Sequence, residues 1–475
     1  MIKKYGTIKV ERNIKKLILE GGFFMGFLST NVEKRREMIL NGNILNTLLL
    51  LSFPTLLMGM VQSLIPLSDG LFLNRTSGYL VAAAVGFGQP IINIINALSQ
   101  GLGVASMAIV GQINGTGDLE QVKKVSTQIM VFSFIIGLIV APTSIIFASI
   151  VTKNINPEIA YDVFLYLSLY AIVIPMLFMA AIFNAIKNAT GQPEATLIRM
   201  IILLLLKIIF NTIFLAVLHW GVIGAVMASL CSYIIIAIWM YYDLFVKRSM
   251  TRLELKGFSF DFPLLKRLLI LALPTMVTYS LINFGFFLIN MEVEKYGAYV
   301  LTAQTIASNI NAMCFNLPSS IGTTVTTMVS MNIGAKKPRN AKKSFNYGCR
   351  VSVVISLIII ALFLPSSNFL VRLFQDNETI VNLADHSLKI YTFSIIGFGI
   401  YMVSQGAFIG LGRTRFPLFM GILRVWFIRY IFILMTKRWL GVDSVFWGNL
   451  VSNYVAGYIF YLVVKRTPWR SVLKK

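Results

Sequence analysis

Long apolar runs follow one another along almost the whole sequence. Each run is close to the roughly 20 residues that an α-helix needs to cross about 30 Å of hydrocarbon. Only 13% of the 475 residues are charged, whereas about a quarter of the residues of a soluble domain are charged. Because a membrane β-barrel would show short alternating strands instead, the sequence predicts an all-α polytopic membrane protein.

The runs predict about twelve transmembrane helices. Pro54 and Pro274 lie inside two of them and are candidate hinge or kink positions, because proline frees a backbone carbonyl and permits a bend. A tolerated kink without hinge function is the alternative for each. We place the spans at residues 45–68, 78–110, 126–150, 162–187, 196–219, 222–246, 266–290, 299–333, 348–372, 385–411, 417–438 and 443–466.

The formal net charge of +23 is distributed as a topology signal. With the N-terminus inside, about 31 Lys and Arg lie on the cytoplasmic side, against about seven outside. The basic clusters "EKRRE", "VKKV", "FVKRSMTRLELK" and "GAKKPRNAKK" all fall on that side. This pattern argues against nucleic-acid binding, and it predicts an integral plasma-membrane protein with both termini in the cytoplasm.

The first 42 residues are expected to form a cytoplasmic tail with no long signal-peptide core. Its "EGGFFM" stretch at residues 20–25 can be encoded by a bacterial ribosome-binding site followed by a start codon. We hypothesise that Met25 is the true start and that residues 1–24 are a mis-annotated leader in a bacterial protein, and an ordinary tail is the alternative. Mass spectrometry of the natural N-terminus distinguishes the two.

The two halves of the sequence match each other at a nearly constant offset. "GYLVAAAVGFGQPI" from Gly78 aligns with "GAYVLTAQTIASNI" from Gly297, and Gly115 aligns with Gly334. Because six spans, an even number, separate the copies, both halves have the same orientation. Such a parallel repeat, related by a pseudo-two-fold axis along the membrane normal, is common in secondary transporters.

The repeat predicts two six-helix lobes between which substrate binds and access alternates. No GxxxxGK[ST] loop for ATP occurs, so an ion gradient or the substrate itself must drive transport. The predicted units are the N-lobe at 43–246, a cytoplasmic linker at 247–265, the C-lobe at 266–466 and a basic tail at 467–475.

Enzymatic and metal-binding functions find little support in the residue types. The three cysteines, Cys231, Cys314 and Cys349, are far apart in apolar segments and show no metal-binding spacing. The two histidines, His219 and His386, both fall near predicted helix ends. We therefore expect no catalytic residues, no metal and no cofactor.

Several stretches occur in a characteristic order: "LSFPTLLMGMVQSLIPLSDGLFLNRTSG", "GLGVASMAIVGQINGTGD", "GVIGAVMASLCSY" and "GAFIGLGRTRFPLF". In order and spacing over twelve spans the chain resembles the multidrug and toxic-compound extrusion (MATE) family of the multidrug/oligosaccharidyl-lipid/polysaccharide exporter superfamily. The last stretch is similar to the family's glycine-rich turn between spans ten and eleven. Its counterpart in the first half is "KNATGQPEATL".

The resemblance implies a cation-responsive polar cluster in the N-lobe, with an Asp on helix 1, an Asn and an Asp one turn apart on helix 5, and a Thr or Ser on helix 6. The matching residues here are Asp69, Lys207, Asn211 and Ser229. Asp69 and Ser229 keep the pattern. On helix 5 a Lys stands in place of the Asn, and an Asn stands in place of the Asp.

Lys207 lies deep in its span, roughly 16–18 Å from either end. Snorkelling reaches only part of that distance. A lone ammonium at this depth costs from about 3 to over 10 kcal/mol, so Lys207 must be neutral, hydrated or paired. Asn211 lies one turn along on the same face, and Asp69 is the acid that the resemblance places nearby, so their pairing is a hypothesis.

Three roles for Lys207 stay open: a permanent ion pair that ties helix 1 to helix 5, a part in ion coupling, and direct contact with an anionic substrate. A sodium site that loses a carboxylate and gains a positive charge binds sodium poorly. We therefore expect proton coupling rather than sodium coupling, since a conformational change can alter the environment of a titratable pair.

The C-lobe has no acid at the matched depth of its spans. Arg424 and Arg429 are five residues apart, so they are expected to point to different faces of helix 11, at least one toward the cavity. The alternative is that they lie at an interface or bind phospholipid head groups. A basic interior would suit anionic or zwitterionic cargo. The polar and basic candidates of the C-lobe are Asn283, Asn290, Asn309, Gln405, Arg424 and Arg429.

The expected function is a MATE-like, ion-gradient-driven antiporter that exports amphipathic small molecules by alternating access. Its expected partners are that substrate and membrane lipids, without nucleic acid, and we expect a monomer in the bacterial inner membrane. The alternative is a flippase for a lipid-linked or anionic head-group substrate. A channel is harder to reconcile with a parallel repeat that lacks a filter motif.

Overall fold

The computed structural model describes residues 32–469 apart from residues 77, 155–156, 248, 257 and 375. The hypothesis about Met25 and residues 1–24 therefore concerns a segment outside the described residues. In the part of the chain that the structure describes, every element of regular structure is a helix.

Each lobe contains six membrane-crossing segments, and several segments are broken into shorter helices. A short helix, α3 (Val32–Asn41), precedes the lobes. The N-lobe consists of α4 (Ile44–Thr76), α5 (Gly78–Thr116), α6 (Leu119–Val151) with η1 (Thr152–Asn154), α7 (Pro157–Tyr170) with η2 (Ala171–Val173) and α8 (Ile174–Ala189), α9 (Pro193–Asn211) with η3 (Thr212–Val217), and α10 (Gly221–Tyr241) with η4 (Tyr242–Val246). The C-lobe consists of α11 (Phe262–Glu294), α12 (Ala298–Gly334), α13 (Pro338–Arg372), α14 (Glu378–Phe393) with α15 (Ile395–Gly410), α16 (Arg415–Ile422) with η5 (Leu423–Tyr430) and α17 (Ile431–Leu440), and α18 (Asp443–Arg466).

Nine of the described helical segments are long and apolar enough to cross a membrane, and the pair α14 and α15, bent by 45°, makes a tenth. Helices α12 and α18 contain 37 and 24 residues and are also long enough. They are less apolar because they face protein: α12 packs against α15, α4, α13 and α5, and α18 packs against α15 and η5. The prediction of a two-lobed, twelve-helix, all-α fold is confirmed.

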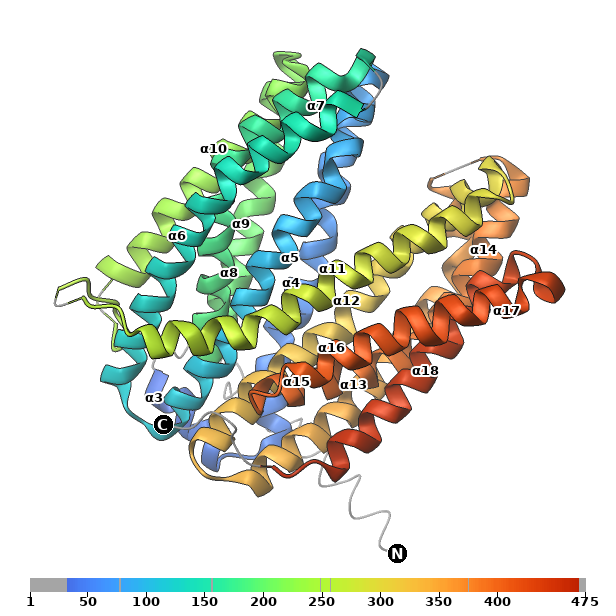
Figure 1. The fold of residues 1–475 in the computed structure, drawn as a ribbon. Coiled ribbons are helices and arrows are strands. Elements are labelled where there is room, and N and C mark those ends of the chain that lie inside the picture. The colour runs from blue at the N-terminus through green and yellow to red at the C-terminus, as the bar shows by residue number, and fades with distance from the viewer. Residues whose placement is uncertain are drawn as a thin grey trace, which may run out of the picture.

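The two lobes meet at the end of the molecule that carries α3 and diverge toward the other end (Figure 1). We call these the closed end and the open end. Helices α4 and α5 of the N-lobe contact α12 and α11 of the C-lobe. Pro54 and Pro274 lie inside α4 and α11, which continue as α-helices through both prolines, so their hinge role stays a prediction.

Glycines allow the lobes to touch at the closed end. Gly115 on α5 lies against the backbone of Met331 on α12, and Gly334 on α12 lies against the backbone of Gln112 on α5. A Cβ atom on either glycine would overlap a carbonyl oxygen of the facing helix. Because the two glycines are equivalent in the repeat, the contact is nearly symmetric.

Hydrogen bonds between the lobes add to this contact. Gln112 Nε2 donates to the carbonyl oxygen of Gly410 at 2.8 Å, and Thr327 Oγ1 donates to that of Asn188 at 3.0 Å. Both acceptors are buried carbonyls near a helix end, and each bond links a side chain of one lobe to the backbone of the other. The closed end is therefore a packed interface between the lobes.

Helix α3 lies across this interface, although the sequence analysis assigned its residues to a tail. The Arg35 guanidinium is 2% exposed and lies 3.2 Å from Glu194 Oε1 at the start of α9 in the N-lobe. On the other side, Lys337 Nζ and Asn340 Nδ2 of the C-lobe donate to the carbonyl oxygen of Leu40 at 3.4 and 3.1 Å. Helix α3 thus binds both lobes at the closed end.

The glycine contact predicts the effect of adding one methyl group. We expect Gly334→Ala to weaken the closed end by about 1–3 kcal/mol, because overpacking forces the backbone to move. The melting temperature of the purified protein in detergent measures this. Gly86→Ala is the matched control, since Gly86 is also helical and has nothing within 4 Å of an added Cβ. Equal melting temperatures for the two variants would contradict the prediction.

Candidate functional site

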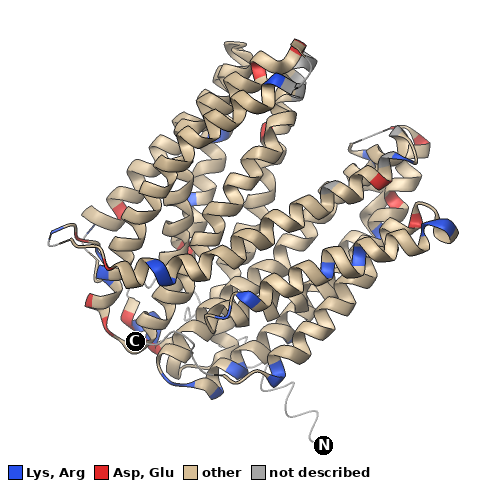
Figure 2. Ribbon diagram, in the orientation of Figure 1, with Lys and Arg blue, Asp and Glu red and all other residues tan. Residues whose placement is uncertain are grey.

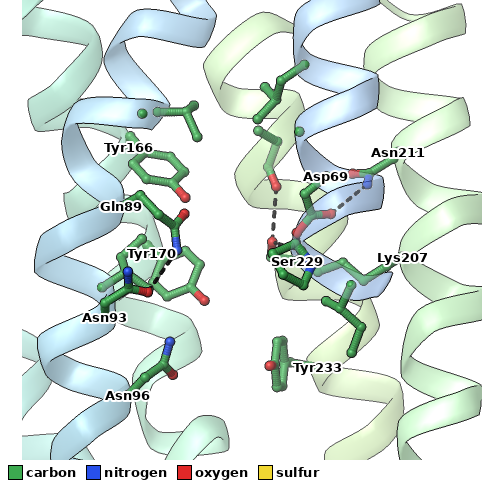
Figure 3. Close-up of a pocket in the computed structure, with 18 of the residues that line it drawn as sticks. Asp69, Gln89, Asn93, Asn96, Tyr166, Tyr170, Lys207, Asn211, Ser229 and Tyr233 are labelled. Carbon is green, nitrogen blue, oxygen red and sulfur yellow. Dashed lines mark hydrogen bonds and ion pairs between the residues drawn. The ribbon is translucent and has the colours of Figure 1, made fainter. Parts of the chain in front are cut away.

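A cavity of about 680 Å³ lies in the N-lobe and faces the C-lobe. Its size is typical of small-molecule sites. Asn283 and Tyr279 on α11 complete the lining from the C-lobe. Figure 3 shows two opposed walls: Gln89, Asn93, Asn96, Tyr166 and Tyr170 on one side, and Asp69, Lys207, Asn211, Ser229 and Tyr233 on the other.

The structure brings all four predicted N-lobe residues together. Lys207 Nζ on α9 lies 2.7 Å from Asp69 Oδ2 on α4 and 2.8 Å from Ser229 Oγ on α10. Asn211 Nδ2, one turn along α9, donates to Asp69 Oδ1 at 2.8 Å. Three helices are therefore joined by one hydrogen-bonded ion pair, in which each carboxylate oxygen accepts a bond.

Burial differs between the two charged partners. The Lys207 side chain is 8% exposed, whereas that of Asp69 is 28% exposed to the cavity. Two buried charges repay their desolvation only when geometry and hydrogen bonding are good, and charge-assisted bonds of this length are strong. The ion pair offsets the free-energy cost of burying the Lys207 ammonium in mid-membrane. The carboxylate of Asp69 is the member of the pair that cavity water can reach.

Local helix geometry helps to position the network. Asn211 is the last residue of α9, and the chain continues directly as the π-helical segment η3. Such π-helical segments often occur at functional sites, since the changed register re-aims side chains. Pro66, one turn before Asp69 on α4, lacks the backbone N–H of an ordinary helical residue and also lines the cavity.

The wall opposite the ion pair is uncharged. Gln89 Nε2 donates to Asn93 Oδ1 at 3.3 Å, and the rings of Tyr166 and Tyr170 lie 5.9 Å apart. Asp69 and Lys207 are the only charged residues in the described lining.

The sequence analysis missed this wall. Its amides recur on α5 at spacings of four, three and four residues, which places them on one helix face, so an amide stripe in an apolar span was the available signal. The stripe consists of Gln89, Asn93, Asn96 and Gln100.

The C-lobe candidates are only partly at this cavity. Asn283 lines it and donates from Nδ2 to the carbonyl oxygen of Tyr279 at 2.9 Å. Asn309 is exposed, Gln405 is buried, and neither belongs to the lining of this cavity. The structure therefore assembles the N-lobe candidates into one site but disperses those of the C-lobe.

Arg424 and Arg429 both lie in the π-helical η5, so the α-helical spacing assumed for them does not apply. That they point to different faces stays a prediction. Both side chains are buried, 8% exposed, in the C-lobe and outside the cavity lining. Arg424 Nη1 donates to Asn453 at 2.9 Å, and the Arg429 guanidinium lies 5.4 Å from the ring centre of Phe286.

Two parallel six-helix lobes around a polar cavity define a two-lobed membrane transporter. The MatE family model matches residues 54–213 and 274–435, once in each lobe. The chain therefore belongs to the MATE family of multidrug efflux transporters, as the sequence predicted, and it is not an enzyme.

Known relatives match over nearly the full chain. The probable multidrug resistance protein YoeA of Bacillus subtilis is 21% identical, with 88% of this chain and 94% of the relative covered. The multidrug export protein MepA of Staphylococcus aureus is 20% identical, with 80% and 85% covered. These bacterial relatives support an integral membrane transporter and do not favour a flippase.

Solved structures share the fold. A MATE crystal structure in the straight conformation superposes with a TM-score of 0.87 at 22% identity, covering 92% of this chain and 98% of that one. A MOP-superfamily transporter from Pyrococcus furiosus, described as having a binding pocket of reverse polarity that suggests a different function, gives a TM-score of 0.85 at 22% identity, covering 92% and 97%.

Unequal burial of the ion pair predicts unequal mutational effects. Asp69→Asn leaves the buried Lys207 ammonium without a counter-charge, so we expect it to destabilise the protein by about 3–5 kcal/mol. Lys207→Gln leaves a carboxylate that is partly hydrated and still accepts from Asn211, so its effect should be smaller. Melting temperatures in detergent at pH 7 measure the difference, and a larger loss for Lys207→Gln would refute this account.

Proposed function

We propose that this protein is a secondary active exporter of amphipathic small molecules, driven by proton antiport with alternating access. The observation that carries the proposal is the Asp69–Lys207 ion pair in the wall of the N-lobe cavity. It joins α4 to α9 beside the space in which a substrate would bind, so a change of protonation at the pair and a movement of α4 are linked.

Charge distribution supports the direction of transport. Lys and Arg gather at the closed end, around α3 and the neighbouring turns (Figure 2). Because loops rich in Lys and Arg stay on the cytoplasmic side, we infer that the closed end is cytoplasmic. The cavity then opens to the outside, which is the arrangement that releases an exported substrate.

This orientation predicts which cysteines an impermeant maleimide can label in intact cells. Cys231, Cys314 and Cys349 are first replaced by serine. A cysteine at Trp439, which is 78% exposed near the open end, should then react in intact cells. A cysteine at Lys124, exposed at the closed end, should react only after permeabilisation. Labelling of position 124 in intact cells would reverse the proposed orientation.

Coordination chemistry supports protons over sodium at this site. Hard cations prefer several oxygen ligands, but both oxygens of Asp69, the only carboxylate in the described lining, already accept bonds from Lys207 and Asn211. The ammonium also repels a second cation. A proton on Asp69 would neutralise the carboxylate and leave a buried ammonium unpaired, so the network would have to rearrange. Proton binding is thereby coupled to the contact between α4 and α9.

The cavity chemistry supports an amphipathic substrate. Tyrosine rings provide apolar contact area with a polar edge, and the amide stripe on α5 offers donors and acceptors without charge. Asp69 and Lys207, the only charged groups in the described lining, neutralise each other. Such a lining suits weakly charged or zwitterionic molecules, in keeping with the multidrug functions named for the relatives.

Dye efflux from bacteria that lack their own pumps tests this proposal. We expect the wild type to export dye with a proton gradient and without dependence on sodium. Asp69→Asn should reduce export to the level of empty vector. The double variant Lys207→Asn, Asn211→Asp rebuilds the family's helix-5 pattern, so we expect its export to become sodium-dependent.

Asn309→Asp is the control for this series, because it adds a carboxylate at an exposed C-lobe position outside the cavity. It should keep the ion dependence of the wild type. Sodium-dependent export by the wild type would overturn proton coupling. Absence of export by a well-expressed wild type, across cationic and zwitterionic dyes, would overturn the proposed substrate class.

A further inference from the structure

A second cavity, of about 440 Å³, lies at the closed end of the C-lobe, well away from the transport cavity. Three arginines line it, together with apolar side chains, and its described lining contains no carboxylate. Its residues are Arg267, Ile270 and Leu271 on α11 and Gly412, Arg413, Thr414, Arg415 and Phe416 at the turn into α16. We call it the arginine pocket.

The internal repeat provides a direct comparison for this pocket. The α8–α9 turn of the N-lobe and the α15–α16 turn of the C-lobe have the same backbone geometry. Gly191 and Gly412 have φ angles of +77° and +74°. In both turns the amide after the glycine donates to a carbonyl five residues earlier, at 2.8 and 2.9 Å. Differences between the two sites therefore arise from side chains and covering elements.

In the N-lobe, helix α3 of the chain itself covers this turn. Glu194, three residues after the glycine, lies 3.2 Å from Arg35 of α3. Ile39 of α3 packs over Gly191, with its Cδ1 atom 3.2 Å from the position of an added Cβ. A protein segment thus supplies both a cation and an apolar side chain to the N-lobe turn.

In the C-lobe the charge of the turn is reversed. Arg415 stands three residues after the glycine, where the N-lobe turn has Glu194, and Arg413 stands where it has Gln192. Arg267 on α11 adds a third positive charge. Among the described residues between η4 and α11, no helix equivalent to α3 occurs. By the internal repeat, the pocket corresponds to the place that α3 occupies on the N-lobe. Its three positive charges are complementary to an anion.

The position of the pocket relative to the membrane identifies the kind of anion. Arg415 is the first residue of the span Arg415–Leu440, and Arg267 lies near the start of the span Phe262–Val293. The apolar surface continues from the pocket toward the middle of these spans: Ile270 is 48% exposed, Leu273 54%, Phe416 39% and Phe419 66%. A basic rim at the membrane boundary therefore leads into an exposed apolar strip.

We propose that the arginine pocket binds an anionic phospholipid of the surrounding leaflet. Its phosphate is held by Arg267, Arg413 and Arg415, since guanidinium forks match phosphate oxygens. Its acyl chains lie along the apolar strip of α11 and α16. The lipid fills on the C-lobe the place that α3 fills on the N-lobe, and it bridges α11 to the turn before α16.

Charge complementarity argues against the chain's own termini as the occupant. Residues 1–31 contain six Lys and Arg against two Glu, and residues 470–475 contain three basic residues and no acid. Both segments would be repelled by the three arginines. A phospholipid supplies both the negative charge and the apolar length that the pocket and its strip present.

Native mass spectrometry of the full-length protein tests the proposal. The protein is released from mixed micelles with equal amounts of phosphatidylglycerol and phosphatidylcholine, and retained lipids are counted. We expect the wild type to retain phosphatidylglycerol preferentially. Each arginine changed to glutamine should lower that occupancy about fivefold. The triple variant Arg267→Gln, Arg413→Gln, Arg415→Gln should therefore retain almost none.

The matched control removes the same charge from exposed basic residues at the closed end that lie outside the pocket. It is the triple variant Lys124→Gln, Lys266→Gln, Arg339→Gln, and it should retain phosphatidylglycerol as the wild type does. Both triple variants must first elute as folded protein in size-exclusion chromatography; if the pocket triple does not, its three single variants carry the test.

Three results would overturn the proposal: equal retention by the wild type and the pocket triple, equal loss in both triples, or equal retention of both lipids by the wild type. Displacement of the bound lipid by millimolar inorganic phosphate would also overturn it, in favour of a free-phosphate site. The readout needs no transport, so its failure would leave the proposed export function untouched.

Discussion

Hydrocarbon does not solvate charge, so every charged side chain within a span must find its partner inside the protein. This constraint fixes how the helices of this transporter are placed. Asp69 and Lys207 join α4 to α9 in mid-membrane. Lys187 and Asp243, each 9% exposed, pair between α8 and η4. Polar contacts therefore decide which helices are neighbours, whereas apolar contact with lipid does not distinguish one helix face from another.

The two lobes share their backbone contacts and turn geometry, but they differ in their charged side chains. Gly115 and Gly334 make equivalent close contacts at the closed end, and the turns at Gly191 and Gly412 are nearly superposable in geometry. Glycine is required at such places because a Cβ atom would either clash or demand a strained φ angle. Side chains are under no such common constraint. The N-lobe accordingly holds a neutralised ion pair, while the buried Arg424 of the C-lobe is met by Asn453 and aromatic rings.

Length and hydropathy were enough to predict the spans, and the internal repeat was enough to predict two lobes. The depth of Lys207 limited it to three states, neutral, hydrated or paired, and the structure shows the pair. Helix α3 was missed because its buried Val32, Ile39 and Leu40 lie in a strongly charged segment and contact the lobes only in three dimensions. The π-helical segment that carries Arg424 was missed for a different reason. A π-helical register depends on hydrogen bonding that composition does not reveal.

The ammonium of Lys207 is covalently attached to the chain, and in this it differs from a bound sodium ion. A sodium ion can enter, stabilise one arrangement of helices and leave, but the ammonium of Lys207 stays on α9 throughout the cycle. In the proposed mechanism the site can therefore be reset only by moving a proton or by moving α4 away from α9. Asp69 is the partner more exposed to the cavity, so under the proposed orientation a proton from the outside reaches the carboxylate first. In the same proposed mechanism the cavity also admits the substrate, so the proton and the substrate compete for one arrangement of α4, which is the condition that antiport requires.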